Sequence, residues 1–196
     1  LAYVHLLEHR GLRGPVARTV ATTKLLDNIA AAHGQEVIET PVGFKWLADA
    51  IEKQGAIVGG EESGGLSIAG HTPGKDGVLA DLLMAEVWAV HRRPLGEIYA
   101  AIMQKYGEYY SHRVDVRLDG DAKEKLMEKL RREPPQNVAG SKVENVVTLD
   151  GVKLNLADGS WLLMRPSGTE SLVRVYMEAS TPQRLKELEA AAQELR

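Results

Sequence analysis

The first residues that could do chemistry lie in a glycine-rich stretch between positions 59 and 77. This stretch holds seven of the chain's 19 glycines, and its polar side chains include Glu61, Ser63, His71 and Lys75. A carboxylate accepts hydrogen bonds and a hydroxyl both donates and accepts, so Glu61 and Ser63 suit the vicinal hydroxyls of a sugar. If the segment is extended, residues two apart point to the same side. The alternative is a flexible surface loop with solvated charges.

The second group lies near the C-terminus and consists of Arg165, Ser167, Gly168, Thr169 and Arg174. An arginine presents a planar fork of donors that matches phosphate oxygens, and the two hydroxyls add further donors. Gly168 allows successive backbone N–H groups to converge on an anion, and Arg174 on the next strand could supply a second cation. These residues therefore predict a phosphate site. The alternative is a hairpin turn with an exposed arginine.

The first half of the chain alternates between strand and helix patterns. Strands are predicted at 16–21, 36–40 and 56–58. Helices are predicted from residue 22 or 23 to residue 32, and at 43–54, 76–91 and 94–106. In the third of these helices we expect a buried face formed by Leu79, Leu82, Leu83 and Val87. Short strand–helix repeats are typical of a parallel sheet with right-handed crossovers. Ligands bind such sheets at the carboxyl ends of the strands, and the glycine-rich stretch follows one of these strands.

The second half reads as consecutive hairpins. We predict strands at 112–118, 143–149, 152–156, 160–165 and 172–177, and helices at 121–132 and 181–195. Asp150-Gly151 and Asp158-Gly159 are dipeptides typical of tight hairpin turns. The predicted fold class is therefore α/β: a three-layer α/β domain with a mainly parallel sheet at 1–110, then a smaller α+β domain with an antiparallel sheet at 111–196. Tyr109-Tyr110-Ser111 is the expected hinge.

Composition excludes several classes of function. The net charge of −3 and the pI near 6.1 give no electrostatic footprint for nucleic acid. The chain has no cysteine, which excludes disulfides and thiolate metal sites and fits a reducing cytoplasm. The histidines show no metal-ligand spacing, and no apolar run approaches the roughly 18 residues of a membrane span. We therefore expect a cytoplasmic protein that has no metal site within this sequence and that binds neither nucleic acid nor membrane.

Two sequence motifs, and the order in which they occur, resemble those of a known family, the α-D-phosphohexomutases. This family contains the phosphoglucomutases and phosphomannomutases. Gly60-Glu61-Glu62-Ser63-Gly64-Gly65, with Lys75-Asp76-Gly77 further on, resembles its sugar-recognition loop. Arg165-Pro166-Ser167-Gly168-Thr169-Glu170, followed by Leu172-Val173-Arg174-Val175, resembles its phosphate-binding loop. The resemblance includes Thr40-Pro41-Val42-Gly43-Phe44-Lys45 and is weakest between residues 111 and 156.

The resemblance implies roles for individual residues. It assigns Glu61 and Ser63 to sugar ring hydroxyls, and the Arg165 loop to the phosphate that does not react. It implies that Lys75 is a cation near the transferred phosphoryl group, where charge neutralisation helps the reaction. A solvated loop lysine is the alternative. We expect Gly43 and Lys45 at the edge of the same pocket, and His71 as a loop or sugar contact rather than a proton carrier.

Two family motifs do not occur in this sequence: the catalytic serine loop and the acidic metal loop of the Asp-Gly-Asp-Gly-Asp-Arg type. The resemblance is thus to domains three and four alone. It implies the C-terminal half of a mutase that interconverts hexose 1-phosphate and hexose 6-phosphate, with glucose favoured over mannose. The full reaction would use a phosphoserine, a bisphosphorylated sugar of the glucose 1,6-bisphosphate type, and Mg²⁺ held by residues outside this sequence.

The implied partners are a phosphosugar and the N-terminal domains of the same protein, and the sequence by itself is expected to show no turnover. Alternatives are a non-catalytic phosphosugar-binding module and a pentose or amino-sugar phosphate mutase. The Glu-Glu-Ser-Gly-Gly form differs from the Glu-Gln-Ser-Gly-His pattern associated with glucosamine phosphates, which argues against an amino sugar.

Overall fold

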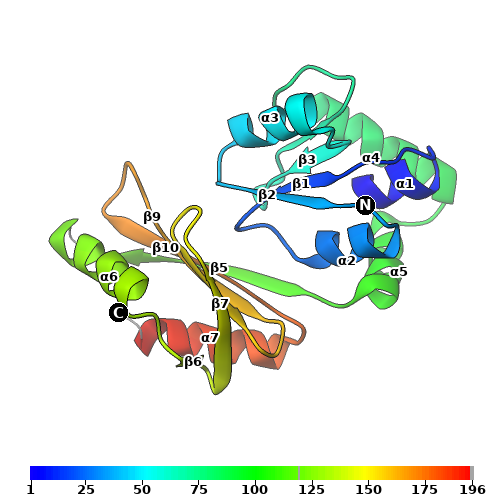
Figure 1. The fold of residues 1–196 in the computed structure, drawn as a ribbon. Coiled ribbons are helices and arrows are strands. Elements are labelled where there is room, and N and C mark those ends of the chain that lie inside the picture. The colour runs from blue at the N-terminus through cyan, green and yellow to red at the C-terminus, as the bar shows by residue number, and fades with distance from the viewer. Residues whose placement is uncertain (119, 195–196) are drawn as a thin grey trace. The chain divides into compact units, whose positions relative to one another are not determined.

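The computed structural model describes residues 1–118 and 120–194. They divide into two compact units, Leu1–Glu108 and Tyr109–Arg196 (Figure 1). The hinge expected at 109–111 is displaced, because Tyr110 and Ser111 already lie in strand β5 (Tyr110–Arg117) and pair with strand β10 (Leu172–Ala179). Residues 195 and 196 of the predicted second domain lie outside the described residues.

The first unit is built on a four-stranded sheet in the order β2-β1-β3-β4. Its strands are β1 (Val16–Thr19), β2 (Val37–Thr40), β3 (Val58–Gly60) and β4 (Leu66–Ile68). β1 pairs in parallel with both β2 and β3, while β4 runs antiparallel to β3. The sheet is therefore mainly parallel, as predicted.

Two helices cover opposite faces of this sheet. The connection from β1 to β2 through α2 (Leu25–Ala32) runs one way across the sheet, and the connection from β2 to β3 through α3 (Phe44–Gln54) runs the other way. Right-handed crossovers in opposite directions place their helices on opposite faces, as Figure 1 shows. The three-layer prediction is confirmed. On the α3 side, the core consists of Ala17, Leu47, Ala50 and Ala56, with Ile38, Phe44 and Ile51 packed against it.

Three further helices complete the first unit: α1 (Ala2–Glu8), α4 (Gly77–His91) and α5 (Leu95–Tyr106), with α4 contacting both others. The buried face predicted for α4 was partly wrong. Leu83 and Val87 are buried, but Leu82 is 66% exposed. Periodicity failed here because apolar side chains occur all around α4, so its sequence does not distinguish an inner face from an outer one.

The second unit contains a six-stranded antiparallel sheet in the order β5-β10-β9-β8-β7-β6. Its other strands are β6 (Asn137–Val138), β7 (Ser141–Val147), β8 (Val152–Leu156) and β9 (Trp161–Pro166), and its helices are α6 (Gly120–Arg132) and α7 (Pro182–Glu194). The predicted antiparallel α+β domain is confirmed. The predicted last residue of the closing helix, Leu195, lies outside the described residues.

Both helices of this unit pack on one face of the sheet, because their side chains share a single apolar cluster with the same alternate strand positions. The cluster includes Leu154, Leu162, Met164, Val175 and Met177 from the strands, Leu126 and Leu130 from α6, and Leu188 from α7. Side chains alternate between the two faces of a strand, so Arg165 and Arg174 lie on the face opposite to the helices. In the described part of the chain, no helix is long and apolar enough to cross a membrane.

Candidate functional site

The glycine-rich stretch is a hairpin rather than a loop without strands. β3 ends at Gly60, a turn follows, and the chain returns as β4. In the turn, the N–H of Glu61 donates to Gly65 O at 2.9 Å and that of Gly64 donates to Glu61 O at 3.0 Å. The expectation that Glu61 and Ser63 lie on an extended segment was therefore wrong. The side chain of Glu61 is only 5% exposed, whereas Ser63 is exposed.

Glu61 forms an ion pair with Lys75, whose Nζ lies 2.6 Å from Glu61 Oε2. The same ammonium lies 5.7 Å from the centre of the Phe44 ring at the start of α3. The resemblance implied that Lys75 lies beside the transferred phosphoryl group, and the structure places it beside the carboxylate of Glu61. Phe44 also brings the first turn of α3, and with it Lys45, to this part of the first unit.

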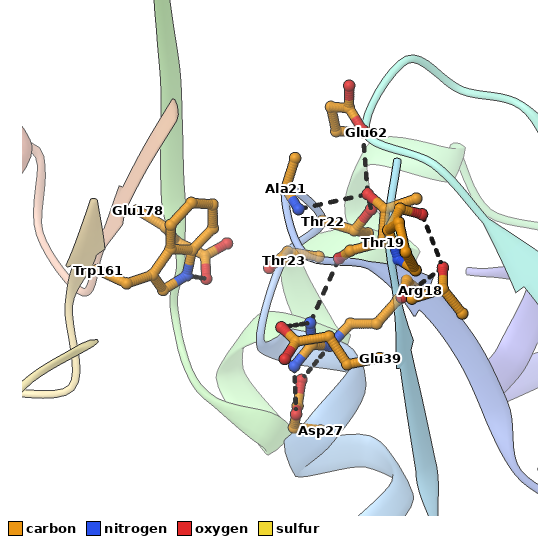
Figure 2. Close-up of polar contacts among 12 residues, drawn as sticks. Arg18, Thr19, Ala21, Thr22, Thr23, Asp27, Glu39, Glu62, Trp161 and Glu178 are labelled. Carbon is orange, nitrogen blue, oxygen red and sulfur yellow. Dashed lines mark hydrogen bonds and ion pairs between the residues drawn. The ribbon is translucent and has the colours of Figure 1, made fainter. Parts of the chain in front are cut away.

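The next residue of the turn, Glu62, contacts the end of β1. Thr19 Oγ1 lies 3.4 Å from Glu62 Oε2 and 2.9 Å from Thr22 Oγ1 (Figure 2). Thr19 and Thr22 are buried. The sequence analysis did not identify these two threonines as site residues, although their position at the end of β1 and just after it was the available signal.

The parallel strands bring three loops to one edge of the sheet. β1 ends at Thr19, β2 at Thr40 and β3 at Gly60, and the carboxyl ends of parallel strands meet at the same edge. Gly43, which precedes α3, has φ +131°, a backbone conformation that favours glycine. Lys45 Nζ lies 4.6 Å from the centre of the Trp46 ring. These residues thus belong to the edge that carries the turn at residues 61–65, which is called the sugar-loop turn below.

A buried arginine near this edge links β1 to α2 and to β2. Arg18 on β1 is 4% exposed and donates to both carboxylate oxygens of Asp27 on α2 at 2.7 Å. It also donates to Glu39 Oε1 on β2 at 2.7 Å (Figure 2). Because its charge is matched by two carboxylates from neighbouring elements, Arg18 is a structural crosslink of the first unit.

A shallow groove of about 380 Å³ borders the sugar-loop turn. Its lining combines residues of the turn with apolar side chains from four helices, including Glu61, Gly64, Ala2, Leu26, Ala80, Met84 and Tyr99. Ligand pockets are commonly mostly apolar with a few convergent polar groups. The groove is thus a concave surface on which one face of a sugar could lie.

His71 is engaged within its own loop. Its Nε2 lies 2.8 Å from Asp76 Oδ2, and Asp76 Oδ1 accepts the N–H of Leu79 at 3.0 Å as the N-cap of α4. Both contacts hold the pKa of Asp76 below its usual range, and the hydrogen bond from the backbone N–H of Leu79 contributes more than the contact with His71. The structure therefore places His71 in a loop contact, one of the two roles expected from the sequence.

In the second unit, Arg165 and Arg174 are direct partners across β9 and β10. Arg165 Nε donates to Asp150 Oδ2 at 2.8 Å, and Arg174 Nη2 donates to Glu170 Oε2 at 2.7 Å. The two side chains are 21% and 29% exposed, respectively. The two arginines expected at the phosphate site therefore lie together on one face of the sheet.

The loop between these strands is organised around Ser167. This residue is 4% exposed, and its Oγ accepts the N–H of Glu170 at 3.2 Å and that of Thr169 at 3.4 Å. The backbone N–H groups therefore converge on a hydroxyl, which keeps its own proton to donate. The φ of Gly168 lies outside the left-handed region, and no atom approaches its Cβ position within 4 Å.

Lys123 is a contact that the sequence analysis missed. Its Nζ lies 3.0 Å from Ser167 O, which attaches α6 to the loop between β9 and β10. It thereby adds a third cation at this loop, after Arg165 and Arg174. Its position in a charged amphipathic helix gave no signal, because every lysine of that helix has a similar sequence environment.

The hairpin turn before β8 positions the counter-charge of Arg165. Gly151 has φ +89°, and a Cβ at this position would overlap Met164 O and lie 3.0 Å from Arg165 Cα. Glycine is therefore required for the turn to approach β9 closely enough for Asp150 to reach Arg165.

The described residues contain no group of three His, Asp or Glu side chains that could hold a metal ion. No chemical step is therefore assigned to a metal held by the described residues.

Family models cover nearly the whole chain: "Phosphoglucomutase/phosphomannomutase, alpha/beta/alpha domain III" matches residues 1–106 and the C-terminal domain of the same family matches residues 114–195. The chain belongs to the phosphoglucomutase/phosphomannomutase family, of which it contains domains III and IV.

Curated relatives agree with this assignment. The chain is 32% identical over 194 residues to a phosphoglucomutase of Komagataeibacter xylinus, an alignment that covers 91% of this chain and 35% of that protein. It is 34% identical over 164 residues to a phosphoglucosamine mutase of Methanococcus maripaludis, covering 84% of this chain and 35% of that protein. The chain therefore spans about a third of the length of these relatives.

Solved structures show the same fold. The open form of pp63/parafusin, a phosphoglucomutase from Paramecium, matches with a TM-score of 0.74 at 27% identity, covering 99% of this chain and 38% of that one. An Aspergillus fumigatus N-acetylphosphoglucosamine mutase in complex with GlcNAc-6P and magnesium matches with a TM-score of 0.55 at 16% identity, covering 99% of this chain and 44% of that one. The binding of GlcNAc-6P and magnesium is a property of that Aspergillus fumigatus protein, and at this identity the match shows the shared fold alone.

Proposed function

We propose that this chain is the sugar- and phosphate-recognition half of a mutase that interconverts hexose 1-phosphate and hexose 6-phosphate, with glucose favoured over mannose. The observation that carries the proposal is the division of two recognition chemistries between two loops. A buried carboxylate, Glu61, lies in the turn of the first unit, and paired guanidinium groups, Arg165 and Arg174, lie in the second. Carboxylates accept from hydroxyls, and guanidinium groups bind phosphate.

In the proposed reaction, a phosphoserine outside this sequence donates its phosphoryl group to the sugar phosphate. The bisphosphorylated sugar, such as glucose 1,6-bisphosphate, turns over, and its other phosphate returns to the serine. Glu61 and Ser63 bind ring hydroxyls in both orientations, with Gly43, Lys45 and His71 at the pocket edge. The loop of Arg165, Ser167, Gly168, Thr169 and Arg174 binds the phosphate that does not react.

Mg²⁺ would assist from ligands elsewhere in the full protein and would neutralise charge on the transferred group. The expectation that Lys75 contributes a cation to the same group remains a prediction. Partners are the phosphosugar and the N-terminal domains that longer relatives possess, and we infer a cytoplasmic enzyme. The chain by itself is proposed to bind substrate without turning it over.

The experiment is an NMR titration of the ¹⁵N-labelled chain with glucose 1-phosphate, inorganic phosphate and glucose. Inorganic phosphate is expected to shift amide signals of residues 165–174, and glucose 1-phosphate those of residues 61–65 as well. A mutase assay on the same sample is expected to show no interconversion. Shifts confined to other surfaces, or turnover by the pure chain, would contradict the proposal.

A second sugar class has a specific observation in its favour. The identity to a phosphoglucosamine mutase, 34%, is as high as the identity to a phosphoglucomutase, 32%. The titration should therefore include glucosamine 6-phosphate beside glucose and mannose 6-phosphates. Tighter binding of glucosamine 6-phosphate would replace glucose as the proposed sugar.

A further inference from the structure

The ion pair between Glu61 and Lys75 joins a buried charge to an accessible one. The side chain of Glu61 is 5% exposed, whereas that of Lys75 is 53% exposed, and 2.6 Å separates Oε2 from Nζ. An ionised carboxylate taken out of water is costly unless a counter-charge accompanies it. In the described part of the chain, Lys75 is the cation that the fold brings to this carboxylate.

The local packing is shaped around this pair. A Cβ built on Gly65 would lie 3.0 Å from Glu61 Oε2, 3.0 Å from Lys75 Cδ and 3.1 Å from Lys75 Cε. Such contacts are tighter than nearly all real Cβ contacts. The absence of a side chain at Gly65 therefore makes room for the carboxylate and the lysine stem together.

Lys75 is itself held from two sides. The next residue, Asp76, caps α4 by accepting the N–H of Leu79 at 3.0 Å and contacts His71 at 2.8 Å. The Phe44 ring lies 5.7 Å from the ammonium. The start of α4 thus fixes the backbone next to Lys75, and the start of α3 brings an aromatic ring near its ammonium group.

We propose that Lys75 is a positioning residue for Glu61. It neutralises the buried carboxylate through the ion pair with Oε2, and this holds the carboxylate in a single orientation in which Oε1 is presented to sugar hydroxyls. This role rests on the proposed function, in which Glu61 binds the sugar. It differs from the role that the family resemblance implies, because Lys75 then acts on recognition of the sugar and not on the phosphoryl group.

The two roles predict different ligand dependence. We would measure binding of glucose 1-phosphate and of inorganic phosphate to the 196-residue chain by calorimetry. Lys75→Met, which keeps an apolar stem and removes the charge, should weaken binding of glucose 1-phosphate about tenfold, as expected for a lost charge-assisted contact. It should leave the affinity for inorganic phosphate within about twofold of the unaltered chain.

Conservative and combined variants separate positioning from folding. Lys75→Arg should recover most of the affinity for glucose 1-phosphate, because it restores the charge. Lys75→Met should cause no further loss in a Glu61→Gln chain, since the partner charge is already gone. Gly65→Ala, which leaves both charges in place, should reproduce the loss. Lys53→Met is the control, because Lys53 is an exposed lysine paired with Asp49 on α3.

Several outcomes would overturn the proposal: equal losses for both ligands with Lys75→Met, additive losses in the double variant, or no loss at all. If the unaltered chain binds no glucose 1-phosphate, the function proposed for the isolated chain fails instead. The amide signals of residues 61–65 then decide the positioning role. Lys75→Met and Glu61→Gln should shift them alike and Lys75→Arg should restore them, whereas unchanged signals overturn the proposal.

Discussion

Arg165 and Arg174 are register partners across β9 and β10, so two guanidinium groups lie next to each other on one face of the sheet. Like charges directly opposite each other destabilise a strand pair. Here each has its own carboxylate, Asp150 for Arg165 and Glu170 for Arg174. A phosphate carries enough charge and enough oxygens to accept donors from both arginines, which makes the pair suited to an anion.

Arg165→Ala should weaken every phosphorylated ligand by a similar factor, because phosphate is common to all of them. Loss of a charge-assisted contact costs about 1.5–3 kcal/mol, or roughly ten- to a hundredfold in affinity. Calorimetry with inorganic phosphate and with glucose and mannose phosphates checks this. Arg113→Ala, at an exposed arginine paired with Asp115 on β5, should leave the affinities unchanged. A change in sugar preference with Arg165→Ala would contradict the assignment.

Glu61→Ala should alter the ratio of affinities between glucose and mannose phosphates, since hydroxyl geometry is what differs between these sugars. A site built to hydrogen-bond a sugar hydroxyl discriminates against sugars that cannot make the bond, so the preferred sugar should lose most. The same titrations of the chain report this ratio. A uniform loss across sugars, equal to the loss for inorganic phosphate, would place Glu61 outside sugar recognition.

Gly151→Ala and Gly159→Ala form a matched pair of turn substitutions. Both glycines have positive φ, +89° and +84°, but only Gly151 has neighbours where its Cβ would lie. Gly159→Ala should cost about 1–2 kcal/mol of unfolding free energy for the left-handed backbone alone. Gly151→Ala should cost more and should also weaken phosphate binding, because it displaces Asp150 from Arg165. Equal effects in chemical denaturation would contradict this explanation.

Leu82→Ala and Leu83→Ala test the orientation of α4. Leu83 is 3% exposed, so its truncation should lower the unfolding free energy by about 2–5 kcal/mol. Leu82 is 66% exposed, and its truncation should change stability by less than about 0.5 kcal/mol. Denaturant titrations of the two variants measure the difference. A larger loss for Leu82→Ala would mean that α4 is rotated relative to the described structure.

Glu86 gives stability a defined pH dependence. Hydrogen bonds from Arg10 and then His5 lower the pKa of Glu86 to about 2. The unfolded value is about 4.3, so the stability contributed by this group is complete above that value and is lost as pH falls towards about 2. Glu86→Gln should therefore flatten the decline in unfolding free energy between about pH 5 and pH 2. If the dependence of unfolding free energy on pH is the same in Glu86→Gln, Glu86 does not contribute to it.

The sequence predicted the fold class because its signals were local and repeated. Alternating strand and helix patterns specified the parallel sheet, and the Asp-Gly dipeptides specified the hairpins of the second unit. The sequence did not predict β4, because Leu66–Ile68 is short and lies among glycines. It also misplaced Leu82, because an apolar helix carries no information about its outer side.

The candidate site was predicted by residue type but not by geometry. Glu61, Lys75, Arg165 and Arg174 were all identified, yet the contact between Glu61 and Lys75 depends on tertiary structure. Fourteen positions separate these residues, and the return of the chain through β4 brings them together. Lys123 was missed because it acts through a long-range contact, for which a single sequence gives no signal. Thr19 and Thr22 were missed although their position at the end of a parallel strand and just after it was a signal.

The outer side of α4 has a practical consequence for handling the chain. Val78, Leu82 and Trp88 are 69%, 66% and 59% exposed on a single helix. Sulfate and phosphate salts strengthen the tendency of apolar surface to leave water. The chain should therefore be retained on a phenyl resin in ammonium sulfate, and Leu82→Lys should elute at higher sulfate. The sulfate concentration at which the chain elutes would thus measure the exposed apolar surface of α4.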